Sequence, residues 1–216
     1  MLLVDKIIKV ATQMDFGKEY YEFSKNFQNF DMKVSGEWQK QYAQAIIQTF
    51  ELQKHHKCLD VGSAMGAQLE GFAKHGIVFY GADVSQWYID NCTFPQIKQR
   101  IGVIVDNKIP FENEQFDFVQ SSQTVEHIPE ADIKPLLMDI KRTMKDGAIL
   151  YISTVEPIAE GYDEKDKTHI SCFERSKWEA IFEECGFKNV TWEYEPRLLE
   201  HKIPKDSQWV NFMLQK

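Results

Sequence analysis

The sequence predicts an α/β protein with a doubly wound, mostly parallel seven-stranded sheet, helices on both faces and an antiparallel hairpin at the C-terminal end. Five short apolar runs, each the length of one strand, alternate with segments of helical periodicity. This alternation is typical of a parallel sheet covered by helices. Two further strand-like runs follow at the end of the chain with only a loop between them, which predicts the hairpin.

The composition fits a single domain. The chain has 216 residues, of which 43% are hydrophobic and 13% aromatic, enough for one sizeable core. The formal net charge of -8 excludes the broadly basic surface that nucleic-acid binding requires. The four cysteines are far apart and form no Cys-x-x-Cys pair, so we expect reduced thiols, as in cytosolic proteins.

The N-terminal part is expected to lie outside the sheet. Its first 35 residues are polar and aromatic and predict a short helix and a loop. Trp38, Tyr42, Ile46 and Phe50 then recur every four residues, which indicates an amphipathic helix. We therefore divide the chain into a helical cap, residues 1–52, and a main domain, residues 53–216. The cap offers four aromatic residues that would either close a ligand site or cover a sheet edge: Tyr20, Tyr21, Phe30 and Trp38.

The remaining elements follow in chain order. Strands are expected at residues 57–61, 77–83, 100–106, 116–122 and 148–155, and the two closing strands at 189–195 and 209–215. Helices are expected at residues 67–75, 87–92, 127–147 and 176–187. Gly147 and Gly186 are expected to end the last two helices, since glycine readily adopts the left-handed conformation of a helix C-terminus.

Polar residues end four of the predicted strands. Asp60, Asp83, Asp106 and Gln123 each lie at, or just beyond, the end of one of the first four strands. In a doubly wound sheet, ligands bind outside the carboxyl ends of the strands, where the strand order switches. Four polar strand ends on one edge therefore predict a ligand site there.

The turn after the first strand fits two kinds of nucleotide loop. A dinucleotide loop, Gly-x-Gly-x-x-Gly or Ala, would use Gly62, Ala64 and Ala67, and it leaves Asp60 and Gly66 without a role. An acid followed by Gly-x-Gly-x-Gly would use Asp60, Gly62, Ala64 and Gly66, so that only Ala64 deviates. Its Cβ demands φ below zero, or a small backbone strain.

The second pattern resembles the class I S-adenosylmethionine-dependent methyltransferases. The similarity runs from about Cys58 to Phe187 and is carried by the order and spacing of four stretches: "LDVGSAMG", "GADVS", "VDNKIPFENEQFDFVQSSQTVEHIP" and "MKDGAILYIST". The resemblance implies a Rossmann-like fold. It also implies S-adenosylmethionine as cofactor, S-adenosylhomocysteine as product, and methyl transfer to a small molecule.

The resemblance implies a set of cofactor-binding residues: Asp60, Gly62, Ser63, Ala64, Gly66, Asp83, Val84, Asp106, Asn107, Ser122 and Gln123. Asp83 lies 21 residues after Gly62, which suits a carboxylate that accepts both ribose hydroxyls. Asp106 would accept from the adenine amino group, with Asn107 beside the ring. Asp60 would orient the loop or meet the cofactor's ammonium through water, and a purely structural role stays open.

Two histidines are candidates for catalysis by the same resemblance. The methyl group leaves a sulfonium by in-line displacement, so the protein must align the acceptor and remove its proton where it has one. His127, in "EHIP", and His169, in "KTHISCF", match positions near the acceptor in the family. A capping or packing role is the alternative for each. Glu126, His127 and His169 follow no metal-ligand spacing, so we expect no metal site.

The acceptor is expected to be a small molecule, methylated on oxygen or nitrogen. The motif of DNA amino-methyltransferases is missing after residue 122, and neither nucleic acid nor a membrane span is expected. The start, "MLLVDKIIKV", has no basic leader, which favours a cytoplasmic protein. Two alternatives stay open at this point: a non-catalytic module with a methyltransferase fold, and an NAD-dependent oxidoreductase. The sequence leaves the oligomeric state undetermined.

Overall fold

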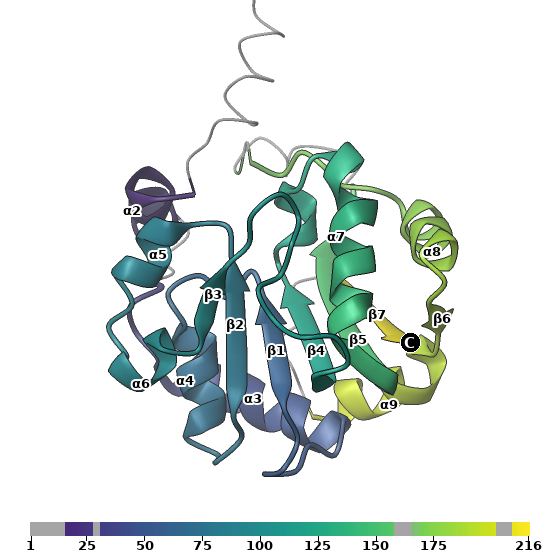
Figure 1. Ribbon diagram of the computed structural model, residues 1–216, viewed down its shortest axis with the longest axis horizontal. Helices are drawn as coiled ribbons and strands as arrows, with labels where there is room; N and C mark the ends of the chain where they lie inside the picture. The colour runs from purple at the N-terminus through teal and green to yellow at the C-terminus, as the bar shows by residue number, and fades with distance from the viewer. Residues whose placement is uncertain (1–15, 28–30, 158–165, 167, 202–208) are drawn as a thin grey trace, which may run out of the picture.

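A computed structural model describes residues 16–27, 31–157, 166, 168–201 and 209–216. Its centre is a seven-stranded sheet of order β3-β2-β1-β4-β5-β7-β6 (Figure 1). The strands are β1 Cys58–Val61, β2 Phe79–Asp83, β3 Ile101–Val103, β4 Phe116–Ser122, β5 Met144–Val155, β6 Lys188–Asn189 and β7 Trp209–Gln215. The first five are parallel and β7 is antiparallel to both neighbours, which confirms the predicted architecture.

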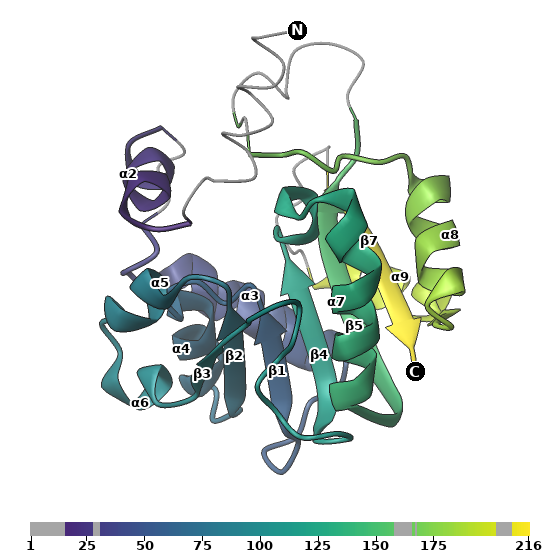
Figure 2. The ribbon, with the colours of Figure 1, turned by 45° about the horizontal axis from the view of Figure 1, so that its top comes forward.

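Helices cover both faces of the sheet, as predicted (Figure 2). They are α2 Lys18–Phe27, α3 Glu37–Thr49, α4 Ala67–Ala73, α5 Gln86–Asp90, α6 Pro95–Lys98, α7 Glu130–Thr143, α8 Arg175–Glu184 and α9 Thr191–Glu200, with a 3-10 turn, η1, at Val125–His127. Successive side chains of β1 point to opposite faces of the sheet and belong to two different hydrophobic clusters. Leu59 and Val61 pack with α7 and α8, whereas Cys58 packs with α3, α4 and α9.

The predicted strand at 189–195 is wrong. Only Lys188–Asn189 pair with β7, and the chain then forms α9. Asn189 Oδ1 accepts a hydrogen bond from the Thr191 backbone N–H at 3.0 Å, at the start of the helix. Leu198 is buried while Trp192 is 74% exposed, so the apolar pattern here has the helical period rather than the period of two. The antiparallel pair therefore exists, but a helix joins its strands.

Two of the other differences from the predicted boundaries change the role of a residue. Helix α7 ends at Thr143, and Gly147 with φ 77° lies within β5, where the pairing register with β4 is irregular. Gly147 therefore does not end the helix. Its positive φ accompanies the irregular pairing of β5 with β4. Strand β3 ends at Val103, so Asp106, with φ 50°, belongs to a tight turn closed by the pair Val105 and Lys108.

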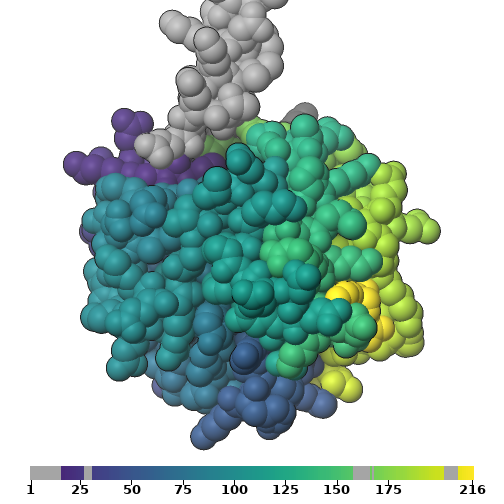
Figure 3. All heavy atoms as spheres, viewed as in Figure 1, coloured from purple at the N-terminus to yellow at the C-terminus, as the bar shows by residue number. Residues whose placement is uncertain are grey.

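The N-terminal elements have two different positions. Helix α3 packs against α4 and α9 and is part of the layer that covers the sheet. Helix α2 stands on the side of the carboxyl ends of the parallel strands (Figure 2). In the space-filling view, α2 projects at the upper edge, next to the segments that follow β2 (Figure 3). Phe30, predicted as a lid residue, lies outside the described residues.

Candidate cofactor and acceptor site

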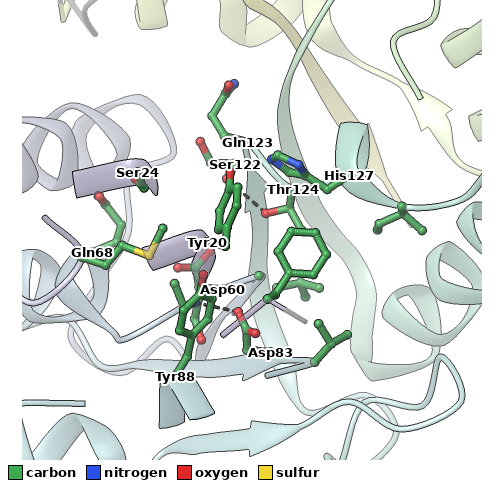
Figure 4. A pocket seen from close by; sticks show the side chains of 18 of the residues that line it. Tyr20, Ser24, Asp60, Gln68, Asp83, Tyr88, Ser122, Gln123, Thr124 and His127 are labelled. Carbon is green, nitrogen blue, oxygen red and sulfur yellow. Dashed lines mark hydrogen bonds between the residues drawn. The ribbon is translucent and has the colours of Figure 1, made fainter. Parts of the chain in front are cut away.

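A cavity of about 1170 Å³ opens at the carboxyl ends of β1, β2 and β4. These strands flank the point where the strand order switches from β1 to β4, which is where doubly wound sheets bind ligands. Figure 4 shows side chains from these strand ends around one space, together with Tyr20 of α2 and His127. Most of the predicted cofactor residues line the cavity: Asp60, Gly62, Ser63, Ala64, Asp83, Val84, Asn107, Ser122 and Gln123.

The loop between β1 and α4 needs its glycines. Gly62 and Gly66 have φ values of 85° and 80°, a region that glycine alone occupies without strain. A Cβ on Gly62 would overlap the side chain of Thr124, and one on Gly66 would lie 2.6 Å from Ile97 Cγ2. Gly66 is the residue before α4 rather than part of the cavity wall.

Ala64 does adopt the strained conformation. Its φ is 46°, in the left-handed region, so the alternative of φ below zero is wrong. Its backbone N–H donates to Asp83 Oδ2 at 2.8 Å, and the residue packs against the cluster that contains Tyr20 and Tyr88. The hydrogen bond to Asp83 and this packing hold the residue in a conformation that costs about 1 kcal/mol.

Two buried carboxylates stand under the loop. Asp83 is 5% exposed and its Oδ1 accepts from the Ser85 N–H at 2.9 Å. Burial raises its pKa to about 6, against the lowering effect of the N–H groups that it accepts. Asp60 is 4% exposed, and burial together with the charge of Asp83 raises its pKa to about 7. Among the described residues, no Lys or Arg side chain lowers the pKa of either carboxylate.

The cavity wall also carries buried polar atoms that have no hydrogen-bond partner among the described residues. They are Tyr42 Oη, Ser63 Oγ, Gln68 Nε2, Gln120 Oε1 and Nε2, and Gln123 Nε2. Such atoms cost about 1–3 kcal/mol each unless a ligand or water satisfies them. Tyr42 and Gln120 were not predicted as site residues. The sequence gives little indication that these two residues belong to the site. Tyr42 occupies an apolar position of a predicted amphipathic helix, and Gln120 lies within a predicted strand.

The adenine side differs from the prediction at one residue. Asp106 is exposed and lies outside the cavity lining, whereas Asn107 lines it. Asn107 Nδ2 donates to Asp132 Oδ1 at 2.8 Å, which fixes the amide at the start of α7. Asp106 and Asn107 both have positive φ, as does Gln123 after β4. Backbone strain of this kind gathers at ligand sites, and here it follows the cavity edge.

The other end of the cavity holds the two predicted histidines, which the structure brings together. The rings of His127 and His169 have centroids 4.7 Å apart, and both line the cavity. His127 Nδ1 lies 3.3 Å from the carbonyl oxygen of Thr168 and 2.8 Å from its hydroxyl oxygen. That hydroxyl donates its own proton to Asp166 Oδ1 at 2.6 Å. Nδ1 therefore faces two acceptors and carries the proton, which leaves the lone pair on Nε2.

Glu126 is fully buried beside this pair. Thr154 Oγ1 donates to its Oε2 at 3.0 Å, and its Oε1 has no hydrogen-bond partner among the described residues. Burial raises its pKa to about 7, and burial together with His169 lowers the pKa of His127 to about 4. One ligand-type atom from each of Glu126, His127 and His169 lies within 4.8 Å of the others. Spacing in the sequence gave no sign of this cluster.

Helix α2 and the segment before it close over this end. Phe16 and Tyr20 each meet the His127 ring edge-on, with centroids 5.7 Å apart. Tyr20 Oη donates to Asp166 Oδ2 at 3.3 Å, across 146 positions of sequence. Tyr20 and Trp38 line the cavity, while Tyr21 packs on Trp87 instead. The contacts of Tyr20 fit the predicted closing role better than a cover for a sheet edge.

A family model for a methyltransferase domain matches residues 35–191. The chain belongs to this methyltransferase family. It is 25% identical over 175 residues to the uncharacterized methyltransferase YcgJ of Bacillus subtilis (strain 168), covering 74% of this chain and 68% of that protein. It is 29% identical over 121 residues to a ubiquinone biosynthesis O-methyltransferase of Coxiella burnetii, covering 54% and 50%. The match to the sterol 4-C-methyltransferase strm-1 of Caenorhabditis elegans is 23% over 186 residues, covering 77% and 55%.

Solved structures share the fold. A SAM-dependent methyltransferase from Archaeoglobus fulgidus superposes with a TM-score of 0.67 at 17% identity, over 92% of this chain and 100% of that one. A Haemonchus contortus phosphoethanolamine N-methyltransferase 2 superposes with a TM-score of 0.63 at 20% identity, over 97% and 59%. The methyltransferase domain thus has the class I architecture. None of the described helices is long and apolar enough to span a membrane.

Proposed function

We propose that the chain transfers the methyl group of S-adenosylmethionine to an oxygen or nitrogen atom of a small molecule. One observation carries the proposal. A single cavity joins the strained loop above Asp83 to the two histidines on the other side. A cofactor bound along that loop would direct its methyl group toward the space beside His127.

The cofactor end offers partners for each part of S-adenosylmethionine. Asp83 would accept from the ribose hydroxyls with the lone pairs that Ala64 and Ser85 leave over. The unpartnered atoms of Tyr42 and Gln120 would meet the amino-acid part, near Asp60. Asn107 would flank the adenine from the turn after β3. Asp106 would contribute only its backbone, because its side chain is exposed.

The acceptor end offers a proton acceptor in a defined tautomer. Methyl transfer forms a bond from the acceptor atom to the methyl carbon as the bond from carbon to sulfur breaks, so the atoms must be aligned. An O–H or N–H acceptor also gives up its proton, and the lone pair on His127 Nε2 would take it. Asp166 acts through Thr168 to keep the other nitrogen protonated. His169, in contact with His127, would position the acceptor.

The relatives favour a small acceptor. Two of them are named for ubiquinone biosynthesis and for sterol methylation, and the aromatic side chains of Phe16 and Tyr20 cover the histidine end of this cavity. Oxygen is the first choice of acceptor atom because a proton acceptor is present, and nitrogen is the second. We assign the closing of the cavity to the cap, residues 1–52, in which Phe16, just before α2, and Tyr20, within it, contact His127.

Calorimetry and turnover test this proposal. S-adenosylhomocysteine should bind the purified chain with a Kd of about 1–100 μM, and NADH should not bind. Replacing His127 by Ala should lower turnover about 100-fold or more while S-adenosylmethionine affinity stays the same. A folded chain that binds no S-adenosylhomocysteine, or one that binds NADH instead, would refute the assignment. Unchanged turnover in His127→Ala would remove that residue from the mechanism.

A further inference from the structure

Glu126, His127 and His169 come together from two distant segments. The first two lie in η1, and the third lies in the segment that follows β5. The backbone N–H groups of Ile170 and Ser171 both donate to the Glu126 carbonyl oxygen at 2.9 Å. These two bonds fix the main chain beside His169 against η1. The convergence of the three side chains is therefore held by the backbone and is not an accident of side-chain rotation.

The three residues form a donor set that suits a transition-metal ion. A carboxylate and two imidazoles bind Zn²⁺ in catalytic sites with one position left open, and similar sets bind other first-row metals. Glu126 is fully buried, and a carboxylate oxygen in such a place is costly without a partner. Its Oε1 has no hydrogen-bond partner among the described residues, and one of its carboxylate oxygens belongs to this cluster. A cation bound there would satisfy it.

The surrounding contacts match those of bound metal ligands. A metal-ligating histidine usually donates its other ring N–H to a carbonyl or carboxylate. His127 Nδ1 does so toward the Thr168 carbonyl and hydroxyl, which leaves Nε2 to bind. Glu126 is held through Oε2 by Thr154 at 3.0 Å.

We propose that Glu126, His127 and His169 form a site for one divalent transition-metal ion, with Zn²⁺ as the best match to the donor set. The site uses the same His127 lone pair that the proposed function needs for the proton. Metal binding and proton transfer at His127 therefore exclude each other, and zinc is expected to inhibit turnover as it fills the site. The exclusion rests on the proposed function, whereas metal binding itself does not.

Cobalt binding to the full-length, chelator-treated chain tests the site. One Co²⁺ per chain should give the visible absorption of a four- or five-coordinate ion, and Zn²⁺ should displace it. Glu126→Gln and His169→Asn should each weaken Co²⁺ binding about 100-fold or more. The matched control is a histidine pair outside the cluster, the exposed His55 and the half-buried His56: replacing both by Asn should leave binding unchanged. Thermal melts would establish that each variant is folded.

Three results would overturn the proposal. They are no Co²⁺ binding up to about 1 mM, undiminished binding in both folded variants, and loss of binding in the His55, His56 control. The outcomes separate this proposal from the proposed function. S-adenosylhomocysteine binding without a cobalt site would refute the metal site alone. A cobalt site without S-adenosylhomocysteine binding would refute the methyltransferase assignment alone.

Discussion

Two groups of buried carboxylates in the described part of this fold differ in their surroundings. Asp139 of α7 is 2% exposed. It accepts from Arg142 Nε at 2.9 Å and Nη2 at 3.0 Å, and from the Ile109 N–H at 2.7 Å. Burial alone would raise its pKa, but these hydrogen bonds and Arg142 lower it to about 2. Arg142 also donates to the carbonyl oxygens of Ile109 and Phe111, so the pair ties the loop after β3 to α7.

Asp60 and Asp83 at the cavity are buried to a similar degree, and yet their pKa values are raised to about 7 and about 6. No cation from the described part of the chain compensates them, and hydrogen bonds from backbone N–H groups only partly offset the burial of Asp83. Burial alone thus does not decide the charge state of a carboxylate; its partners do. The Asp139 carboxylate is paired within the protein, and this pairing stabilises the fold. Asp60 and Asp83 are only partly paired, and a ligand with hydroxyl and cationic groups would supply the missing partners.

The largest expected effect is on the clamp. Arg142→Met should lower the free energy of unfolding by about 3 kcal/mol. It removes two hydrogen bonds to the buried Asp139 and leaves the exposed Lys108, at 3.1 Å from Oδ1, as its cation. Chemical denaturation would measure the loss. Lys145→Met is the matched control, since the ion pair of Lys145 with Asp117 is at the surface and should contribute less than about 1 kcal/mol. Equal losses in the two variants would show that the clamp is no stronger than a surface pair.

A crossed pair of variants tests the division between stability and binding. Asp83→Asn should weaken S-adenosylmethionine binding about 100-fold, because two charge-assisted hydrogen bonds to the ribose are weakened. Asp139→Asn should leave that affinity within about threefold while the free energy of unfolding falls by about 2 kcal/mol. Calorimetry gives the S-adenosylmethionine affinity of each variant, and chemical denaturation gives its free energy of unfolding. If Asp139→Asn weakened binding as much as Asp83→Asn, the two regions would not be separate.

The strand ends that border this site could be predicted from the sequence, because the prediction depends only on neighbouring residues. The polar residue that ends an apolar strand marks the carboxyl edge of a parallel sheet, and Asp60 and Asp83 were found in this way. The rule failed at Asp106, since β3 ends three residues earlier, at Val103. It failed for α9 as well, because seven residues with Pro196 beyond them alternate well enough to resemble a strand. The helical face appears only when Leu198 is included.

The remainder of the site could not be predicted because it depends on contacts between distant segments. Glu126 and His169 are brought together by backbone hydrogen bonds that no spacing rule describes. Tyr42 was expected only as one position of an amphipathic helix, whereas in the structure it lines the cavity. Asp139 and Arg142 are only three positions apart in the sequence. Their pair stabilises the fold because both side chains also form hydrogen bonds with the backbone of the distant residue Ile109.

The two regions should respond to pH with opposite signs. Asp139 has a folded pKa below its unfolded value of about 3.9. Its contribution, about 2 kcal/mol, is present above pH 4 and is lost as pH falls through about 2. Asp83 has a folded pKa near 6, so its contribution is present below pH 4 and is lost as pH rises through about 6. Stability curves of Asp83→Asn and the parent chain, measured without cofactor, should therefore diverge between pH 4 and pH 7, with the variant less sensitive.

Cofactor binding should reverse the second trend. S-adenosylmethionine favours the charged form of Asp83, so binding should release protons near pH 6 and tighten as pH rises. Calorimetry in two buffers of different ionisation enthalpy would count the protons. No proton release between pH 5.5 and 6.5, with Asp83→Asn behaving like the parent, would mean that the ligand does not meet this carboxylate.

The smallest expected effect is that of replacing Ala64. The experiment shows whether the Ala64 methyl group points toward the cofactor or away from it. Ala64→Gly removes about 1 kcal/mol of left-handed strain but adds about as much freedom to the unfolded chain, so the free energy of unfolding should change by less than about 1 kcal/mol. Affinity for S-adenosylmethionine should also stay within about threefold, because Ala64 packs toward the cluster of Tyr20 and Tyr88. Ala64→Val should instead destabilise the chain and weaken binding, since a β-branched residue resists positive φ and would shift the N–H that Asp83 accepts. Tenfold tighter binding in Ala64→Gly would contradict this and place the methyl group in the path of the cofactor.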